Sequence, residues 1–130
     1  MPMLNYGLNI LYARVSDISP LKDPLGPVNL KELTLRGTEV SDISPLKDLV
    51  NLEELDLGWC QMLSDISLLR NLKNLKKLTL DFTQVSDISP LSNLVYLTYL
   101  NLSRTNVSDI SLLSNLENLK KTWSLALPNF

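Results

Sequence analysis

The sequence predicts an α/β solenoid, in which one short structural unit is repeated along the chain. Three observations predict it: a segment of the type Val-Ser-Asp-Ile-Ser recurs, a Leu-x-Leu pair recurs with it, and Ser-Pro-Leu completes three of the copies. Self-similarity at a period of about 20–50 residues is typical of solenoids and repeat arrays. We therefore expect a single repeat domain over residues 1–130, with about five repeats.

The recurring pentapeptide sets the period of the chain. It begins at Val15, Val40, Leu63, Val85 and Val107, so successive copies lie 25, 23, 22 and 22 residues apart. Leu-x-Leu is a period-two alternation, which indicates a short half-buried strand. The copies of this pattern predict strands near residues 8–10, 33–35, 55–57, 78–80 and 100–102.

The Ser-Pro-Leu segments predict short helical or 3-10 turns between the strands. Each places a potential N-cap serine before a proline at the first helical position, at Ser19, Ser44 and Ser89. In the other two copies Leu68 and Leu112 replace the proline. A single unit buries too little apolar surface to offset the entropy of ordering it, so the units must stack. We expect the strands on a concave side and the turns on a convex side.

The composition excludes several common kinds of catalysis. The chain has no histidine, and Cys60 is its one cysteine. Ser-His-Asp and Cys-His catalysis, the common zinc ligand sets and an intrachain disulfide are therefore ruled out. No phosphate-binding glycine loop is present either. We predict no catalytic residue, no metal site and no cofactor, and hence a protein that is not an enzyme.

Charge and hydropathy argue against nucleic acid and membrane partners. The formal net charge is −2, and the basic doublets are Lys76-Lys77 and Lys120-Lys121, whereas phosphate binding needs concentrated Lys and Arg. No apolar stretch approaches the ~20 residues of a membrane span. The start of the chain lacks the pattern of a secretory signal. The sequence does not assign a compartment, and the missing signal favours a cytoplasmic one.

The run LTLDFTQVSDISPLSNLVYLTYLNLSRTNVSDIS resembles the bacterial 22-residue leucine-rich repeat of the internalin type. The resemblance extends from about Leu8 to Leu119. It implies a right-handed leucine-rich-repeat solenoid with a parallel concave β-sheet and short helical or 3-10 turns on the convex side. It also implies a non-catalytic function in which the concave face binds a protein partner.

The sequence departs from this family pattern at the turns and at the C-terminal end. The family's ladder asparagine is replaced by Ala13, Thr38, Cys60, Thr83 and Thr105. Leucines are missing at Thr122 and Ser124. A three-residue insertion would restore them and make Leu125-Ala126-Leu127 the last strand; the alternative is an irregular end over 120–130.

The variable residues of the repeats fall on the predicted concave face. Trp59 and Phe82 occupy the same position in adjacent repeats, so their backbones should lie about 5 Å apart. Aromatic residues and arginine are enriched at binding hot spots. The alternative is that Trp59 and Phe82 cover the edge of the core as packing residues. The predicted protein-binding residues are Arg36, Trp59, Asp81, Phe82, Tyr99 and Arg104.

An aspartate recurs in every unit. These residues are Asp17, Asp42, Asp65, Asp87 and Asp109. A cation ladder would offer one carboxylate per repeat, whereas calcium takes six to eight oxygens. We therefore expect each carboxylate to accept backbone N–H bonds at its turn. Cys60 falls at an inward position, and we expect a buried and inert thiol.

Two functions are compatible with this pattern. The first is a protein-protein interaction module that binds a partner on the concave face. The alternative is a self-associating structural or scaffold solenoid, a homo-oligomer that assembles through its uncapped ends. The apolar residues that could serve assembly are Met1, Met3 and Leu4 at one end and Trp123, Leu125, Leu127 and Phe130 at the other.

Overall fold

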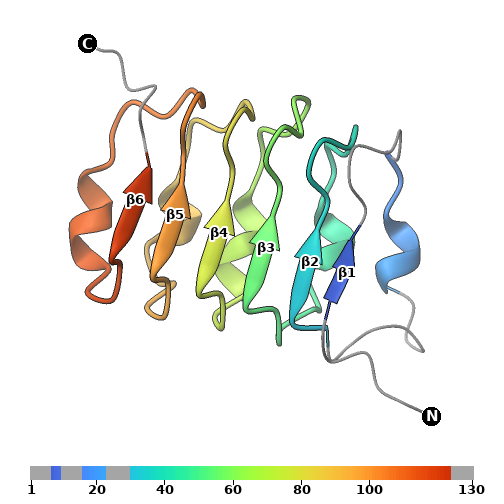
Figure 1. Ribbon diagram of the computed structural model, residues 1–130, viewed down its shortest axis with the longest axis horizontal. Coiled ribbons are helices and arrows are strands. Elements are labelled where there is room, and N and C mark those ends of the chain that lie inside the picture. Colours follow the sequence, from blue (N-terminus) through green and yellow to red (C-terminus); the bar gives the residue numbers. More distant parts are fainter. Residues whose placement is uncertain (1–6, 10–15, 23–29, 124–130) are drawn as a thin grey trace.

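The computed structural model describes residues 7–9, 16–22 and 30–123, and it shows a parallel six-stranded sheet. The strands follow one another in the sheet in chain order, and 3-10 helices lie on the other side of the solenoid (Figure 1). The strands are β1 (Gly7–Asn9), β2 (Glu32–Thr34), β3 (Glu54–Asp56), β4 (Lys77–Thr79), β5 (Tyr99–Asn101) and β6 (Lys121–Trp123). The 3-10 helices are η1 (Ser19–Lys22), η2 (Ser44–Leu46), η3 (Ser67–Asn71), η4 (Ser89–Leu91) and η5 (Ser111–Asn115).

The strands β1 to β5 each begin one residue earlier than the Leu-x-Leu pairs predict. The reason is visible at β3, where Glu54 N donates to Lys31 O at 3.0 Å and so brings the residue before Leu55 into the sheet. The second leucine of the pair, Leu57, still donates its N–H to Thr79 O at 2.8 Å. It lies just beyond the assigned strand.

The last described strand, β6, keeps the register of the earlier repeats. In β6, Lys121 pairs with Tyr99 and Thr122 pairs with Leu100, one repeat earlier. Strand β6 therefore begins without the three-residue insertion that was one of the two alternatives, and residues 121–123 form a strand where the other alternative placed an irregular end. Hydrogen bonds of a parallel ladder join backbone groups, so the strand forms although Thr122 replaces a leucine. Residues 125–127 lie outside the described part of the chain, as do the side chains proposed for end-to-end assembly.

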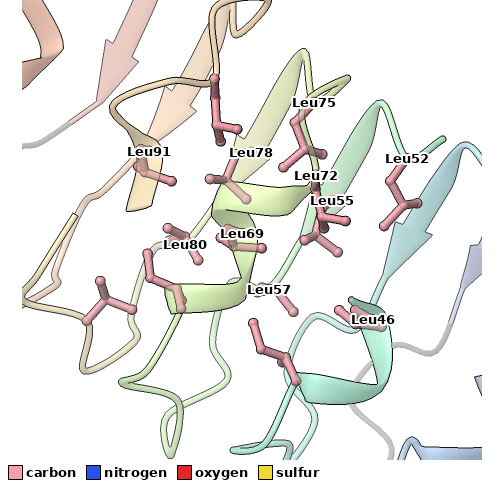
Figure 2. Close-up of a cluster of buried hydrophobic side chains, with 14 of the residues drawn as sticks. Leu46, Leu52, Leu55, Leu57, Leu69, Leu72, Leu75, Leu78, Leu80 and Leu91 are labelled. Carbon is pink, nitrogen blue, oxygen red and sulfur yellow. The ribbon is translucent and has the colours of Figure 1, made fainter. Parts of the chain in front are cut away.

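The core is a stack of leucine layers, one from each repeat. Figure 2 shows leucines of successive repeats gathered between the strands and the 3-10 helices, among them Leu55, Leu57, Leu69, Leu78 and Leu80. All five side chains are almost completely buried. Burial of one leucine contributes roughly 1.5–3 kcal/mol, so this stack supplies the main stabilisation of the domain.

The repeated aspartates stabilise the turns that lead into the 3-10 helices. Each accepts the N–H of the serine two residues later at 2.9 Å, in the pairs Asp17–Ser19, Asp42–Ser44, Asp65–Ser67, Asp87–Ser89 and Asp109–Ser111. This confirms the structural role predicted for the aspartates. The hydrogen bonds, first from the backbone and then from the side chain of the serine, lower the pKa values of Asp17, Asp65, Asp87 and Asp109.

The prediction that serine is the N-cap is wrong. The residues before η2 to η5 are isoleucines, Ile43, Ile66, Ile88 and Ile110, and they make no side-chain capping bond. The serine is instead the first residue of the 3-10 helix, and the aspartate provides the acceptor from outside it. Proline is the second residue of η2 and η4, one position later than expected.

The residues that replace the ladder asparagine bond mostly within their own turn. Thr83 Oγ1 donates to Leu80 O at 2.7 Å, and Thr38 Oγ1 donates to Leu35 O at 2.8 Å. Cys60 differs, because its Sγ reaches Leu35 O of the preceding repeat at 3.1 Å. Every buried side-chain nitrogen and oxygen of the described residues has a hydrogen-bond partner. A threonine at this position therefore supplies a hydrogen-bond donor to a carbonyl oxygen of its own turn. It does not bridge to the neighbouring turns, as the donors and acceptor of an asparagine can.

Candidate functional site

The outward side of the sheet, here called the concave face, carries two columns of side chains. One column is Glu32, Glu54, Lys77 and Tyr99, and the other is Thr34, Asp56, Thr79 and Asn101. The strand register places the members of each column directly beside one another, one repeat apart. The alternation of the strands puts the intervening leucines into the core.

A shallow depression of about 330 Å³ lies on the concave face. Its wall is largely polar, and it includes charged side chains of both signs. Its lining residues are Glu32, Leu33, Thr34, Arg36, Glu54, Leu55, Asp56, Lys77, Thr79, Tyr99 and Asn101. The depression is partly open to solvent.

At one border of the depression, Arg36 bridges two aspartates from two different repeats. Its Nη1 lies 3.1 Å from Asp56 Oδ1 and 3.0 Å from Asp81 Oδ1, and its Nη2 lies 2.8 Å from Asp81 Oδ2. The Asp81 side chain is only 8% exposed, whereas those of Arg36 and Asp56 are 25% and 29% exposed. The paired, two-pronged contact with Asp81 is the strong form of an arginine–carboxylate bond.

Gly58 makes the bridge from Arg36 to Asp81 possible. It occupies the same position as these two residues in the repeat between them. A Cβ at residue 58 would overlap Arg36 Nη1 and Asp81 Oδ1. The absence of a side chain at Gly58 therefore opens the path along which Arg36 spans one full repeat.

Trp59 and Phe82 stack on each other next to this bridge. Their ring centroids are 3.9 Å apart, and the planes differ by 16°. Both residues hold a left-handed backbone with φ of 59°, which is uncommon for a bulky residue and costs about 1–3 kcal/mol. Trp59 remains 37% exposed. The rings therefore form an accessible aromatic surface at the carboxyl edge of the sheet.

The other two predicted binding residues lie in neighbouring repeats. Tyr99 belongs to the concave face, where Lys77 Nζ lies 5.1 Å from the centre of its ring. Arg104 is exposed and holds the same left-handed φ of 59° as Phe82, one repeat earlier. The structure thus joins Arg36 to Asp81, Trp59 to Phe82 and Tyr99 to Lys77.

Sequence reasoning did not select three residues of this surface: Asp56, Gly58 and Lys77. Gly58 and Lys77 stand in the same repeat positions as residues that it did select, whereas Asp56 stands in the column of Thr34, Thr79 and Asn101, none of which was selected. The signal that could have found Lys77 is its place directly beside Tyr99 in one column, where a cation meets an aromatic ring. Gly58 could have been noticed as the one glycine between Arg36 and Asp81 in their column.

The described part of the chain contains one cysteine, Cys60. Cys60 is buried, and burial raises the pKa of its thiol above the ordinary value of 9.0, although hydrogen bonds from Thr38 oppose this shift. Across residues 7–9, 16–22 and 30–123, no three His, Cys, Asp or Glu side chains converge as metal ligands. No helix in these ranges is long and apolar enough to cross a bilayer.

The stacked units, the parallel sheet and the leucine layers together define a leucine-rich-repeat solenoid. A family model described as leucine-rich repeats (2 copies) matches residues 28–65. The chain is similar to internalin C2 from Listeria monocytogenes, with 33% sequence identity and a TM-score of 0.85, over 92% of this chain and 51% of that one. It is therefore an internalin-like leucine-rich-repeat protein.

Two further solved structures share the fold. An internalin, InlF, from Listeria monocytogenes is 32% identical with a TM-score of 0.68, over 87% of this chain and 39% of that one. TLR13, from its complex with ssRNA13, is 23% identical with a TM-score of 0.70, over 90% of this chain and 18% of that one, which shows the fold alone. The chain thus spans about half of internalin C2 and less of the others. A comparison with curated protein sequences found no significant match.

Leucine-rich-repeat proteins of this class are in general protein-interaction modules without enzymatic activity. The fold therefore places this chain among interaction modules. It does not identify the partner or the surface that the partner occupies, because one scaffold serves many different binding sites.

Proposed function

We propose that this chain binds a partner protein on its concave face and that it acts without catalysis. The single observation that carries the proposal is the stack of Trp59, 37% exposed, on Phe82, beside the Arg36 bridge that borders the concave depression. Both residues adopt a left-handed backbone conformation, which costs less free energy for glycine than for other residues. Gly37 adopts this conformation in the preceding repeat. The repeat architecture itself does not require aromatic residues at this position.

The surroundings of the stack support protein recognition. The depression offers the Tyr99 ring, and the Arg36 bridge holds its border rigid through two carboxylates. Rigid aromatic anchors beside a polar depression are the arrangement that hot spots of protein interfaces share. The proposed contact residues are Arg36, Trp59, Asp81, Phe82, Tyr99 and Arg104, with Arg36 and Asp81 acting mainly by holding the surface in shape.

The proposal is tested by affinity capture from a lysate of the source organism, with the native chain and the Trp59→Ala/Phe82→Ala variant. Loss of a captured protein in the variant, with an unchanged circular dichroism spectrum, is the expected result. The matched control is Val50→Ala/Val95→Ala, because these valines are also exposed, at 47% and 51%, and lie away from the stack. The control should capture the same protein as the native chain.

Other results would contradict the proposal. If the aromatic variant loses its folded signal, the two rings are packing residues of the core edge. If it captures the same protein as the native chain, the partner binds elsewhere. If each chain captures only further copies of itself, and the solution mass exceeds the chain mass of 14.6 kDa, the protein is a self-associating solenoid.

A further inference from the structure

We propose that the concave face binds an extended segment of the partner protein in which a basic and an acidic residue lie two positions apart. This inference rests on the proposed function, and it names the chemistry of the partner segment. The basic residue of the segment pairs with the carboxylates of Glu32 and Glu54, and its acidic residue pairs with the ammonium group of Lys77.

The inference follows from the order of charges along one column of the concave face, here called the charged column. Its members are Glu32, Glu54, Lys77 and Tyr99, which lie side by side in strands β2 to β5. All four line the concave depression, and the three charged side chains are exposed. A molecule in the depression therefore meets two negative charges followed by one positive charge.

The three charges of this column form no ion pair within the described part of the chain. Lys77 stands directly beside Glu54, but its Nζ lies 5.1 Å from the centre of the Tyr99 ring instead. Glu32 and Glu54 stand beside each other, and two neighbouring carboxylates repel. A cation placed over both glutamates relieves this repulsion, and a carboxylate placed over Lys77 supplies its missing counter-charge.

The remaining charges of the depression are already engaged with each other. Among its described lining residues these are Arg36 and Asp56, whose side chains bond at 3.1 Å. Asp56 also accepts the N–H of Gly58 at 2.9 Å. The charges that a partner meets unpaired in the depression are therefore those of the charged column.

The spacing of these charges matches an extended backbone that crosses the strands. Neighbouring strands lie about 4.8 Å apart, so the midpoint between Glu32 and Glu54 lies about 7 Å from Lys77. Side chains two positions apart in an extended segment point to the same side and lie about 6.6 Å from each other. A basic residue over the two glutamates thus places the acidic residue over Lys77.

The order of charges also discriminates against other segments. A segment with two acidic residues at these positions places one of them over the glutamates, and a segment with two basic residues places one of them over Lys77. Like charges that meet across an interface suppress the wrong partner, and complementary charges fix the register of the right one. The charged column therefore selects one basic and one acidic residue.

The test uses the immobilised full chain and, as the probe, a phage library of random heptapeptides. After selection, peptides with a basic and an acidic residue two positions apart, in either order, should be about threefold more frequent than in the unselected library. The absence of this enrichment would overturn the inference. Enrichment of pairs three or four positions apart, the spacing of neighbours on a helix, would also overturn it.

Lys77→Glu is the decisive variant, because it continues the negative charge along the column. It should change the enriched pair from one basic and one acidic residue to two basic residues. The matched control is Lys73→Glu, which makes the same change of charge at an exposed residue of the same repeat that does not line the depression. The control should enrich the same peptides as the native chain.

Identical selections by Lys77→Glu and by the native chain would refute the role of Lys77. If circular dichroism shows that Lys77→Glu does not fold, Lys77→Gln takes its place. That variant should keep the enrichment of basic residues and lose the enrichment of acidic residues two positions away, and an unchanged preference for the acidic residue would again refute the inference.

The inference and the proposed function fail in distinguishable ways. If Lys77→Glu captures the partner from the lysate as well as the native chain does, while Trp59→Ala/Phe82→Ala does not, the role of the charged column is refuted and concave-face binding stands. If the library yields the expected peptides but both variants still capture the partner, the partner occupies another surface, and the proposed function is refuted instead.

Discussion

Arg36 reaches Asp81 across an entire intervening repeat, with 2.8 Å between Nη2 and Oδ2. In a solenoid most contacts join adjacent repeats. The Arg36–Asp81 pair is instead a direct contact between two repeats that are separated by a third. The bond borders the concave depression and lies next to the column of Trp59 and Phe82. It is therefore positioned to keep the proposed binding surface rigid.

The first prediction concerns Gly58, whose missing side chain leaves room for the bond between Arg36 and Asp81. Gly58→Ala should lower the free energy of unfolding by about 1–3 kcal/mol, because the new Cβ displaces Arg36 and leaves the little-exposed Asp81 without its arginine. Gly58 is absent from the left-handed positions, so the cost is one of overlap and not of backbone strain. Urea unfolding followed by circular dichroism measures the change.

Ser103→Ala is the matched control for Gly58→Ala. Ser103 stands in the same column one repeat after Asp81, and its bond to Asn101 Oδ1 uses the backbone N–H, which alanine keeps. Its stability should stay within about 0.5 kcal/mol of the native value. An equally small effect of Gly58→Ala would show that the bridge contributes no stability.

The second prediction concerns the aromatic stack. A double-mutant cycle of Trp59→Ala and Phe82→Ala should give a coupling energy of about 0.5–1.5 kcal/mol, the range for stacked aromatic pairs. The cycle is measured by urea unfolding of the native chain, both single variants and the double variant. A coupling near zero would mean that the rings do not stabilise each other in solution.

The third prediction concerns the aspartates at the turns. The N–H of Ser67, followed by its side chain, lowers the pKa of Asp65 below its ordinary value of 3.8. The stabilising bond is thus fully present above pH 3.8 and is lost as the pH falls through the lower folded-state pKa. A ¹³C NMR titration of the Asp65 carboxyl should give a midpoint below 3.8.

Ser67→Ala separates the two causes of this shift. The variant keeps the backbone N–H, the larger cause, and removes the side-chain hydroxyl. The pKa of Asp65 should therefore rise toward the ordinary value without reaching it. A midpoint at or above 3.8 in the native chain would contradict the hydrogen bond that the structure shows at 2.9 Å.

The fourth prediction concerns Cys60. Burial raises the pKa of its thiol, and Sγ donates to Leu35 O at 3.1 Å. The native protein should react with a thiol reagent such as iodoacetamide about a hundredfold more slowly than the urea-unfolded chain at the same pH. A native rate close to the unfolded rate would show that this turn opens readily and that the thiol is reactive.

The position of each side chain within the solenoid follows largely from the sequence. A period of about 22 residues places equivalent residues side by side, so the columns of the concave face and the proximity of Trp59 and Phe82 could be predicted. The burial of the leucines follows from their alternation. The predicted contact set remains a proposal, because its test requires a partner.

The pairing of side chains within and between these columns required the tertiary structure. Repeat spacing identifies neighbours, but the choice of Asp81 by Arg36 depends on the empty volume at Gly58 and on side-chain rotamers. The unbroken register of β6 also required it, because ladder bonds join backbone groups and do not depend on the missing leucine at Thr122.

The sequence by itself therefore determined the repeat, the fold class and the inward or outward side of each strand residue, because these depend on local periodicity. The tertiary structure decided which charges meet and how closely the rings of Trp59 and Phe82 stack. These features depend on distances of a few ångströms between residues far apart in the chain, which a one-dimensional pattern does not contain.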